Sequence, residues 1–390
     1  MVWLVAILAV AALAAIGIGG LAGYQLARRR MREAIRESKA RTAELIATWQ
    51  QDETLAGAFA ISKSRETADH PAAVLAGVER CYYAPPDFER ITWVPRDIPT
   101  PFVGYAPAPG RHASAIINEA QFRYAGELEM PKPSGTYRIF LTGASTAFGA
   151  GASSNETTIG GYLEKYLNRN RRCEVVTAAA CAWSSTHERI LIENRLVEFE
   201  PDLVISFSGH NDVFWASQGY NSAWYRGMQD SYFLTLMNAT RLSNSVAEFP
   251  SHVPGIGRPP SIEEVTERLV RNVVLAQHAL TLVDARYMFV LQPTMEVTGK
   301  SRTPREQRVA ASAASWPWFG LMEQFYVEFR NNLSALHKPG FAFIDLTSVF
   351  DNCGDDIEVF IDTAHFGDRG NDLIAQSLCK HVLPFVSAGS

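Results

Sequence analysis

From about residue 136 onward, short apolar runs alternate with longer stretches of helical character, and this alternation limits the possible folds most. We expect strands at 137–142, 174–178, 202–208, 286–292 and 341–346. We expect helices near 157–169, 186–199, 262–284, 318–336 and 368–383. Strands that alternate with helices form a parallel sheet covered on both faces. The sequence therefore predicts an α/β fold, a three-layer α/β/α sandwich with a five-stranded parallel sheet.

Two long stretches without clear periodicity interrupt this alternation, an insertion at about 214–260 and a second stretch at 293–317. Loops of this length in a compact domain are usually functional or disordered, and the aromatic content of the first argues against disorder. We expect Trp215, Trp224 and Tyr225 to form one wall of a substrate cleft. The alternative is a cap in which these side chains only pack together.

Polar residues follow the predicted strands at their carboxyl ends, where sites form in open parallel sheets. Ser145 follows the first strand and Asn211 the third, while Ala182 lies in the loop after the second. Asp362 and His365 come just before the last helix. We expect these segments to meet at one edge of the sheet.

This set of residues fits acyl transfer to a serine. A serine hydroxyl becomes a nucleophile when a neighbouring base accepts its proton, and histidine has a suitable pKa for that role. Asp362 and His365 are three residues apart, so in a turn the carboxylate can reach Nδ1 and leave Nε2 for Ser145. Taken singly, Ser145 also fits a helix cap, Asn211 a turn former and His365 a surface histidine.

Three segments resemble the sequence blocks of the SGNH/GDSL hydrolases: LTGASTAFG, GHND and DTAHFGDRGNDLIA. They occur in the family's order over about residues 136–386. The resemblance implies the flavodoxin-like SGNH fold, with Ser145 as nucleophile, His365 as base and Asp362 as its partner. It also implies an oxyanion hole made by the amides of Ser145 and Ala182 and the side chain of Asn211.

The chain departs from the family pattern at two positions. Ala144 stands where the family often has aspartate, a residue without a catalytic role in the family scheme. Ala182 stands where the family usually presents a glycine to the oxyanion. An alanine amide can donate there only if the backbone does not require glycine.

The amino terminus predicts a membrane anchor. Residues 2–23 carry no charge and are numerous enough to cross a bilayer, and no basic segment precedes them as in a cleavable signal peptide. A GxxxG pair, Gly19 and Gly23, is compatible with a helix-mediated oligomer. The predicted organisation is a transmembrane anchor (1–27), a juxtamembrane helix (28–60), an aromatic and proline-rich arm or cap (61–135) and a hydrolase domain (136–390).

The charges beside the anchor predict its orientation. Five arginines lie between residues 28 and 36, whereas no basic side chain precedes the anchor. Basic flanks tend to stay in the cytoplasm, so we expect the catalytic domain on the cytoplasmic face of the cell membrane. The scattered, unpatterned cysteines agree with a reducing compartment. The alternative is a periplasmic or extracellular domain that acts on finished polysaccharide.

Composition excludes several other classes of function. The net charge is −5 and no long basic stripe is present, so nucleic acid is not an expected partner. The five cysteines lack metal-type spacing, and neither a metal nor an organic cofactor is implied.

The expected function is that of a serine esterase acting on an acylated small molecule or glycan, and the resemblance implies O-acetyl groups on carbohydrate. One alternative is an O-acyltransferase that uses the same serine and passes the acyl group to a sugar hydroxyl. Another is a catalytically inactive scaffold at the membrane that binds a glycan or a partner.

Overall fold

The computed structural model describes residues 97–112, 114–169, 171–217, 260–314 and 319–387, together with Arg29, Arg30 and Glu33. The chain divides into two compact units, one of Met1–Phe59 with Asp230–Val253 and one of Ala60–Gln229 with Pro254–Ser390. The second unit contains all the strands described below.

The predicted anchor at 1–27 lies outside the described residues, and the predicted helix at 28–60 is described only at three helical positions. No described helix has the length and apolarity needed to span a membrane.

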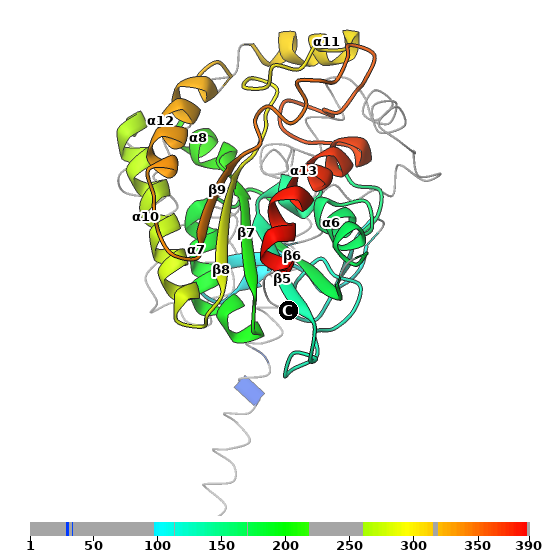
Figure 1. The fold of residues 1–390 in the computed structure, drawn as a ribbon, viewed down its shortest axis with the longest axis vertical. Coiled ribbons are helices and arrows are strands. Elements are labelled where there is room, and N and C mark those ends of the chain that lie inside the picture. Colours follow the sequence, from blue (N-terminus) through cyan, green and yellow to red (C-terminus); the bar gives the residue numbers. More distant parts are fainter. Residues whose placement is uncertain are drawn as a thin grey trace, which may run out of the picture. The chain divides into compact units, whose positions relative to one another are not determined.

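A five-stranded parallel sheet forms the centre of the second unit (Figure 1). Its strands are β5 (Tyr137–Gly143), β6 (Cys173–Ala179), β7 (Leu203–Ser208), β8 (Arg286–Leu291) and β9 (Phe341–Asp345). Their order in the sheet is β6-β5-β7-β8-β9. The five predicted strands are confirmed. Because β6 and β7 lie on opposite sides of β5, the strand order reverses at the carboxyl end of β5, where doubly wound sheets bind their ligands.

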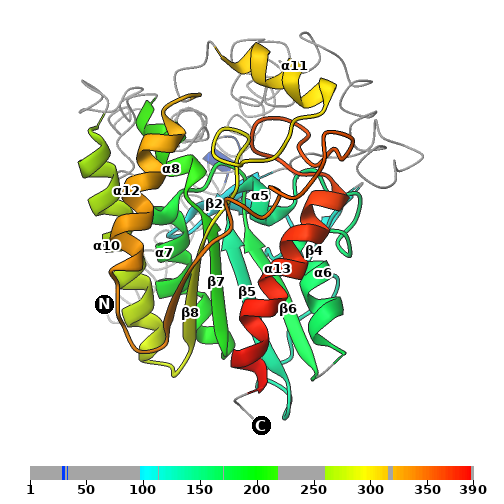
Figure 2. The same ribbon diagram turned by 45° about the horizontal axis from the view of Figure 1, so that its top comes forward.

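Helices cover both faces of this sheet (Figure 2), as the sequence predicted. One face carries α6 (Ile159–Leu167) and α13 (Asp368–Ser387). The other carries α7 (Ser185–Asn194), α10 (Ile262–Thr281) and α12 (Met322–Ser334).

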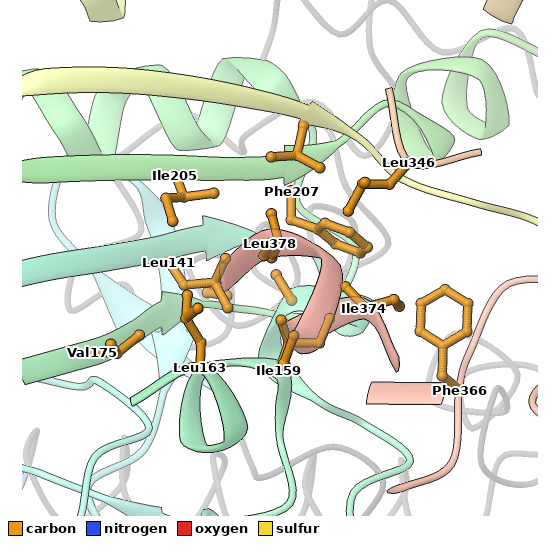
Figure 3. Close-up of a cluster of buried hydrophobic side chains, with 14 of the residues drawn as sticks. Leu141, Ile159, Leu163, Val175, Ile205, Phe207, Leu346, Phe366, Ile374 and Leu378 are labelled. Carbon is orange, nitrogen blue, oxygen red and sulfur yellow. The ribbon is translucent and has the colours of Figure 1, made fainter. Parts of the chain in front are cut away.

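Successive residues of a strand point to opposite faces of the sheet, so the buried side chains form two hydrophobic clusters, one on each face. Leu141 lies in the core cluster that contains Leu163 of α6 and Ile374 of α13 (Figure 3). Its neighbour Phe140 lies in the other cluster, with Leu269 of α10. Every residue of β5 is buried, as expected of a strand with helices on both faces.

Three helices at the carboxyl edge of the sheet were not predicted. They are α5 (Ser145–Phe148), α8 (His210–Ser217) and α11 (Pro304–Ala313). The prediction that 293–317 lacks regular structure is wrong for α11. The Thr303 side chain accepts from the N–H of Glu306 in a capping box, and Pro304 stands at the first turn, so a readable start signal was present. The insertion at about 214–260 is described only at its two ends.

The described part of the predicted arm, 97–135, packs on the free edge of β6. It contains the hairpin of β1 (Asp97–Thr100) and β2 (Gly104–Pro107), followed by the short pair β3 (Gly110–Arg111) and β4 (Ile116–Ile117). The backbone N–H of Arg123 donates to the carbonyl of Thr177 in β6 at 2.8 Å. This antiparallel contact covers part of an edge that would otherwise expose unpaired backbone groups.

Candidate active site

Ser145 stands at the first residue of α5, immediately beyond β5. The turn depends on Gly143, which has a φ of +150°. A Cβ at this position would lie 2.4 Å from the carbonyl oxygen of Phe207, so only glycine fits. The first N–H groups of a helix have no partner within it, and the partly exposed Ser145 therefore offers both a hydroxyl and a backbone donor at the sheet edge.

Ser145, His365 and Asp362 lie in one hydrogen-bonded chain. His365 Nε2 is 2.7 Å from Ser145 Oγ, and His365 Nδ1 is 3.0 and 2.9 Å from the two carboxylate oxygens of Asp362. Asp362 Oδ1 also accepts the backbone N–H groups of Ala364 and His365 at 2.9 and 2.8 Å. These bonds hold the carboxylate against Nδ1 and orient Nε2 toward the serine, the geometry that serine activation requires.

The loop after β6 contains Ala182, and β6 pairs with β5, the strand that leads to Ser145. Neither the N–H of Ala182 nor that of Ser145 has an acceptor among the described residues. Asn211 in the first turn of α8 donates one N–H of Nδ2 to the carbonyl of Trp183 at 2.8 Å. A carboxamide has two such hydrogens, and the part of the chain described offers the second no acceptor. Three donors are thus present on the segments that the sequence indicated.

Ala182 adopts the backbone conformation that favours glycine, with a φ of +64°. Two hydrogen bonds hold this loop. Trp215 Nε1 donates to the carbonyl of Ala182 at 3.0 Å, and the Tyr105 hydroxyl donates to the carbonyl of Cys181 at 2.9 Å. Ala182 therefore adopts, at an energetic cost, the conformation expected of the glycine usual at this position, and its N–H still has no acceptor among the described residues.

Trp215, predicted as a cleft wall, lies in the interior instead. It is 3% exposed and contacts the Ala182 loop from within the fold. The reason is its place in α8, where it shares the buried side with Asp212 and Val213. Trp224 and Tyr225, predicted to form the same wall, lie outside the described residues.

The strain at Ala182 leads to a prediction about stability. Replacing Ala182 by glycine should remove a left-handed penalty of roughly 1–2 kcal/mol and raise the thermal unfolding midpoint by a few degrees. Ala180, in the same loop, is fully buried and has no positive φ. Ala180→Gly should lower the midpoint, since it adds chain entropy to the unfolded state and removes a buried methyl group. Equal losses in both variants, measured by calorimetry, would show that no strain is stored at Ala182.

Asp212 ties the Ala182 loop to α8. Its carboxylate accepts the N–H of Ser185 at 3.1 Å and the Ser185 hydroxyl at 2.6 Å. Complete burial raises the pKa of Asp212, while the two bonds from Ser185 oppose that shift. Asp212 therefore connects the segment that carries Asn211 with the start of α7, directly after the loop that contains Ala182.

Two further titratable groups, His210 and Glu296, are half-buried and lie near Asp362 and His365. Burial lowers the pKa of His210 to about 4, with a hydrogen bond to Asn211 opposing the shift, so this imidazole is neutral at pH 7. Burial raises the pKa of Glu296 to about 7, helped by the charge of Asp362 and opposed by Thr294. No sequence motif pointed to Glu296.

No cluster of three or more potential metal ligands occurs in the described part of the chain. A serine, a histidine, a carboxylate and amide donors are the groups that acyl transfer to a serine uses.

No protein-family model matches this sequence, and no curated protein matches it either. Solved structures with a similar fold include an acylhydrolase from Bacteroides fragilis, at 11% identity and a TM-score of 0.38, covering 67% of this chain and 92% of the other. A catalytic mutant of an acetylxylan esterase from Geobacillus stearothermophilus has 13% identity and a TM-score of 0.38, covering 63% and 94%. A GDSL-like lipase from Bacteroides ovatus has 14% identity and a TM-score of 0.39, covering 66% and 56%.

Proposed function

We propose that the protein is a serine esterase of the SGNH/GDSL type that hydrolyses acyl esters through an acyl-serine intermediate. The observation that carries the proposal is the continuous chain from Ser145 Oγ through His365 to Asp362, with distances of 2.7 and 2.9 Å. The substrate we propose is an O-acetyl ester of a carbohydrate or small molecule, on the basis of the sequence resemblance.

In the first half of the reaction, His365 Nε2 accepts the proton of Ser145 while Oγ attacks the acyl carbon. The carbonyl oxygen becomes an oxyanion, which the N–H groups of Ser145 and Ala182 and the amide of Asn211 stabilise. When the intermediate collapses, the C–O bond to the alcohol breaks and His365 returns the proton to the leaving oxygen. Asp362 stabilises the imidazolium throughout.

In the second half, a water molecule takes the place of the alcohol. His365 accepts one proton of this water as its oxygen attacks the acyl-serine carbonyl. Collapse of the second intermediate breaks the bond to Ser145, and the proton passes from His365 to Oγ. The products are the carboxylic acid and the original enzyme.

The experiment that tests the function follows acetate release from p-nitrophenyl acetate and from a panel of acetylated glycans, with wild type and Ser145→Ala compared. Adding an unacetylated sugar acceptor distinguishes the O-acyltransferase alternative, since acetate release would then fall as acetylated acceptor accumulates. An inactive scaffold would release no acetate from any substrate and would not react with a fluorophosphonate.

We also propose that residues 1–27 anchor the protein in the cell membrane with the catalytic domain on the cytoplasmic face. The arginines between residues 28 and 36 support this orientation. Fusions of alkaline phosphatase and of a fluorescent protein to Ser390 test it. We expect a fluorescent fusion and an inactive phosphatase, and the reverse pair of results would place the domain outside.

A further inference from the structure

The segment that follows β8 runs beside the turn that carries Asp362 and His365. The N–H of Met295 donates to the carbonyl of Thr363 at 2.8 Å, inside the turn itself. The carbonyl of Met295 in turn accepts a bond from Arg302 Nη2, also at 2.8 Å. A residue 68 positions earlier in the sequence is therefore bonded to the peptide between the two proposed catalytic side chains.

A second contact from the same segment reaches the two residues that precede the turn. Arg305, in the first turn of α11, is buried. Its Nη1 donates to the carbonyl of Phe360 at 3.0 Å, and its Nη2 donates to the carbonyl of Ile361 at 2.7 Å. These carbonyls belong to the two residues immediately before Asp362. The N–H of Ile361 donates to the carbonyl of His365 at 2.8 Å, so the peptide that Arg305 contacts also closes the turn.

Glu306 completes the arrangement beside Arg305. Its Oε1 accepts the N–H groups of Val359 and Phe360, each at 3.1 Å. Its Oε2 accepts a hydrogen bond from Lys300 Nζ at 2.6 Å. In this ion pair the Lys300 side chain is 1% exposed and the Glu306 side chain 0%. Removing two charges from water is costly unless close contact and further hydrogen bonds compensate, and Glu306 has such bonds from the N–H groups of Thr303, Val359 and Phe360. Arg305 and Glu306 thus occupy both the carbonyl and the N–H groups of the strand-like segment that leads into Asp362.

We propose that Arg305 is a positioning residue for the Asp362–His365 pair, and that α11 serves as the support of the catalytic turn. The proposal rests on the serine esterase function proposed above. Arg305 touches no reacting atom. It acts by fixing the peptides of Phe360 and Ile361, and through them the direction of the Asp362 carboxylate toward His365 Nδ1.

The two bonds that Arg305 makes to adjacent carbonyls require the planar fork of a guanidinium, which lysine cannot reproduce. A displacement of about 1 Å in a catalytic group costs roughly 10²-fold in rate. Arg305→Gln should therefore lower kcat about 10²-fold with little change in KM, because no contact with substrate is removed. Arg305→Lys retains the charge and one donor direction, so its kcat should lie between the kcat of Arg305→Gln and that of wild type.

A double-mutant cycle separates positioning from general damage to the fold. The kcat of wild type, Arg305→Gln, Asp362→Asn and the double variant is measured with p-nitrophenyl acetate and expressed per serine labelled by a fluorophosphonate. Asp362→Asn alone should lower kcat about 10⁴-fold. If Arg305 acts through Asp362, the double variant should be no slower than Asp362→Asn, since the two effects act through one group.

The matched control is Arg308→Gln, an exposed arginine on the same helix, which should keep the wild-type kcat. A further 10²-fold loss in the double variant, or a wild-type kcat in Arg305→Gln, would overturn the proposal. If Arg305→Gln does not fold, the same cycle with Arg305→Lys decides the question by the same criterion. Absence of Ser145-dependent turnover in wild type would instead refute the esterase function itself.

Discussion

Replacing Ser145 by alanine is expected to lower kcat for ester hydrolysis by about 10³–10⁶-fold and to leave the fold intact. The serine hydroxyl contributes one 2.7 Å contact with His365 Nε2 and no bond that supports the sheet. Its loss removes the group that forms the acyl intermediate, while the backbone N–H at this position remains. Initial rates with p-nitrophenyl acetate, together with thermal unfolding, measure the two parts of this expectation.

Asn211→Ala provides a graded comparison for the serine variant. One oxyanion donor is typically worth about 10²–10³ in kcat, so this variant should be slow but still reactive with a fluorophosphonate. Ser145→Ala should not react with that probe at all. Wild-type rate and wild-type labelling in Ser145→Ala would mean that another residue is the nucleophile.

The sheet could be predicted from the sequence because its strands are short, mostly apolar runs, as expected where helices cover both faces. In β5, all residues from Tyr137 to Gly143 are buried, and no polar alternation obscures the strand. The alternation of strands and helices does not by itself fix the strand order. The reversal beside β5 could be expected only by analogy with other doubly wound folds. The candidate triad of Ser145, His365 and Asp362 could also be predicted, because Asp362 and His365 share one turn and Ser145 comes shortly after the first strand of the sheet along the chain.

Other features of the site depend on contacts between segments far apart in sequence. The left-handed backbone of Ala182 is held by Trp215 and Tyr105, and nothing in the sequence near Ala182 specifies either partner. Trp215 belongs to an aromatic-rich insertion, a composition that fits a cleft wall as well as an interior position. Only the packing of α8 decides that its indole is buried. By contrast, α11 could have been predicted from the local sequence, because the capping box that begins at Thr303 marks a helix start.

Arg123 connects the arm to the catalytic domain and is completely buried. A guanidinium has five N–H donors, and all five have acceptors. Nε donates to Asn155 Oδ1, and the remaining four donate to backbone carbonyl oxygens, those of Ser114, Phe148, Gly149 and Ser154. Burial lowers the pKa of Arg123 to about 10, with the charge of Asp368 opposing the shift, so the side chain stays charged at neutral pH.

Arg123→Met is therefore expected to destabilise the protein by about 3–5 kcal/mol, the usual result of breaking a buried charged network. Methionine fills a similar volume, but each buried carbonyl left without a donor costs about 1–3 kcal/mol. Two of these carbonyls, at Phe148 and Gly149, end the helix that begins with Ser145, so activity should fall at temperatures below the unfolding midpoint.

Urea denaturation followed by circular dichroism measures the change in unfolding free energy. Arg111→Met is the control, since Arg111 is an exposed arginine of the same arm and should change stability by less than about 0.5 kcal/mol. Similar unfolding free energies for the two variants would show that the arm is not held to the catalytic domain through Arg123.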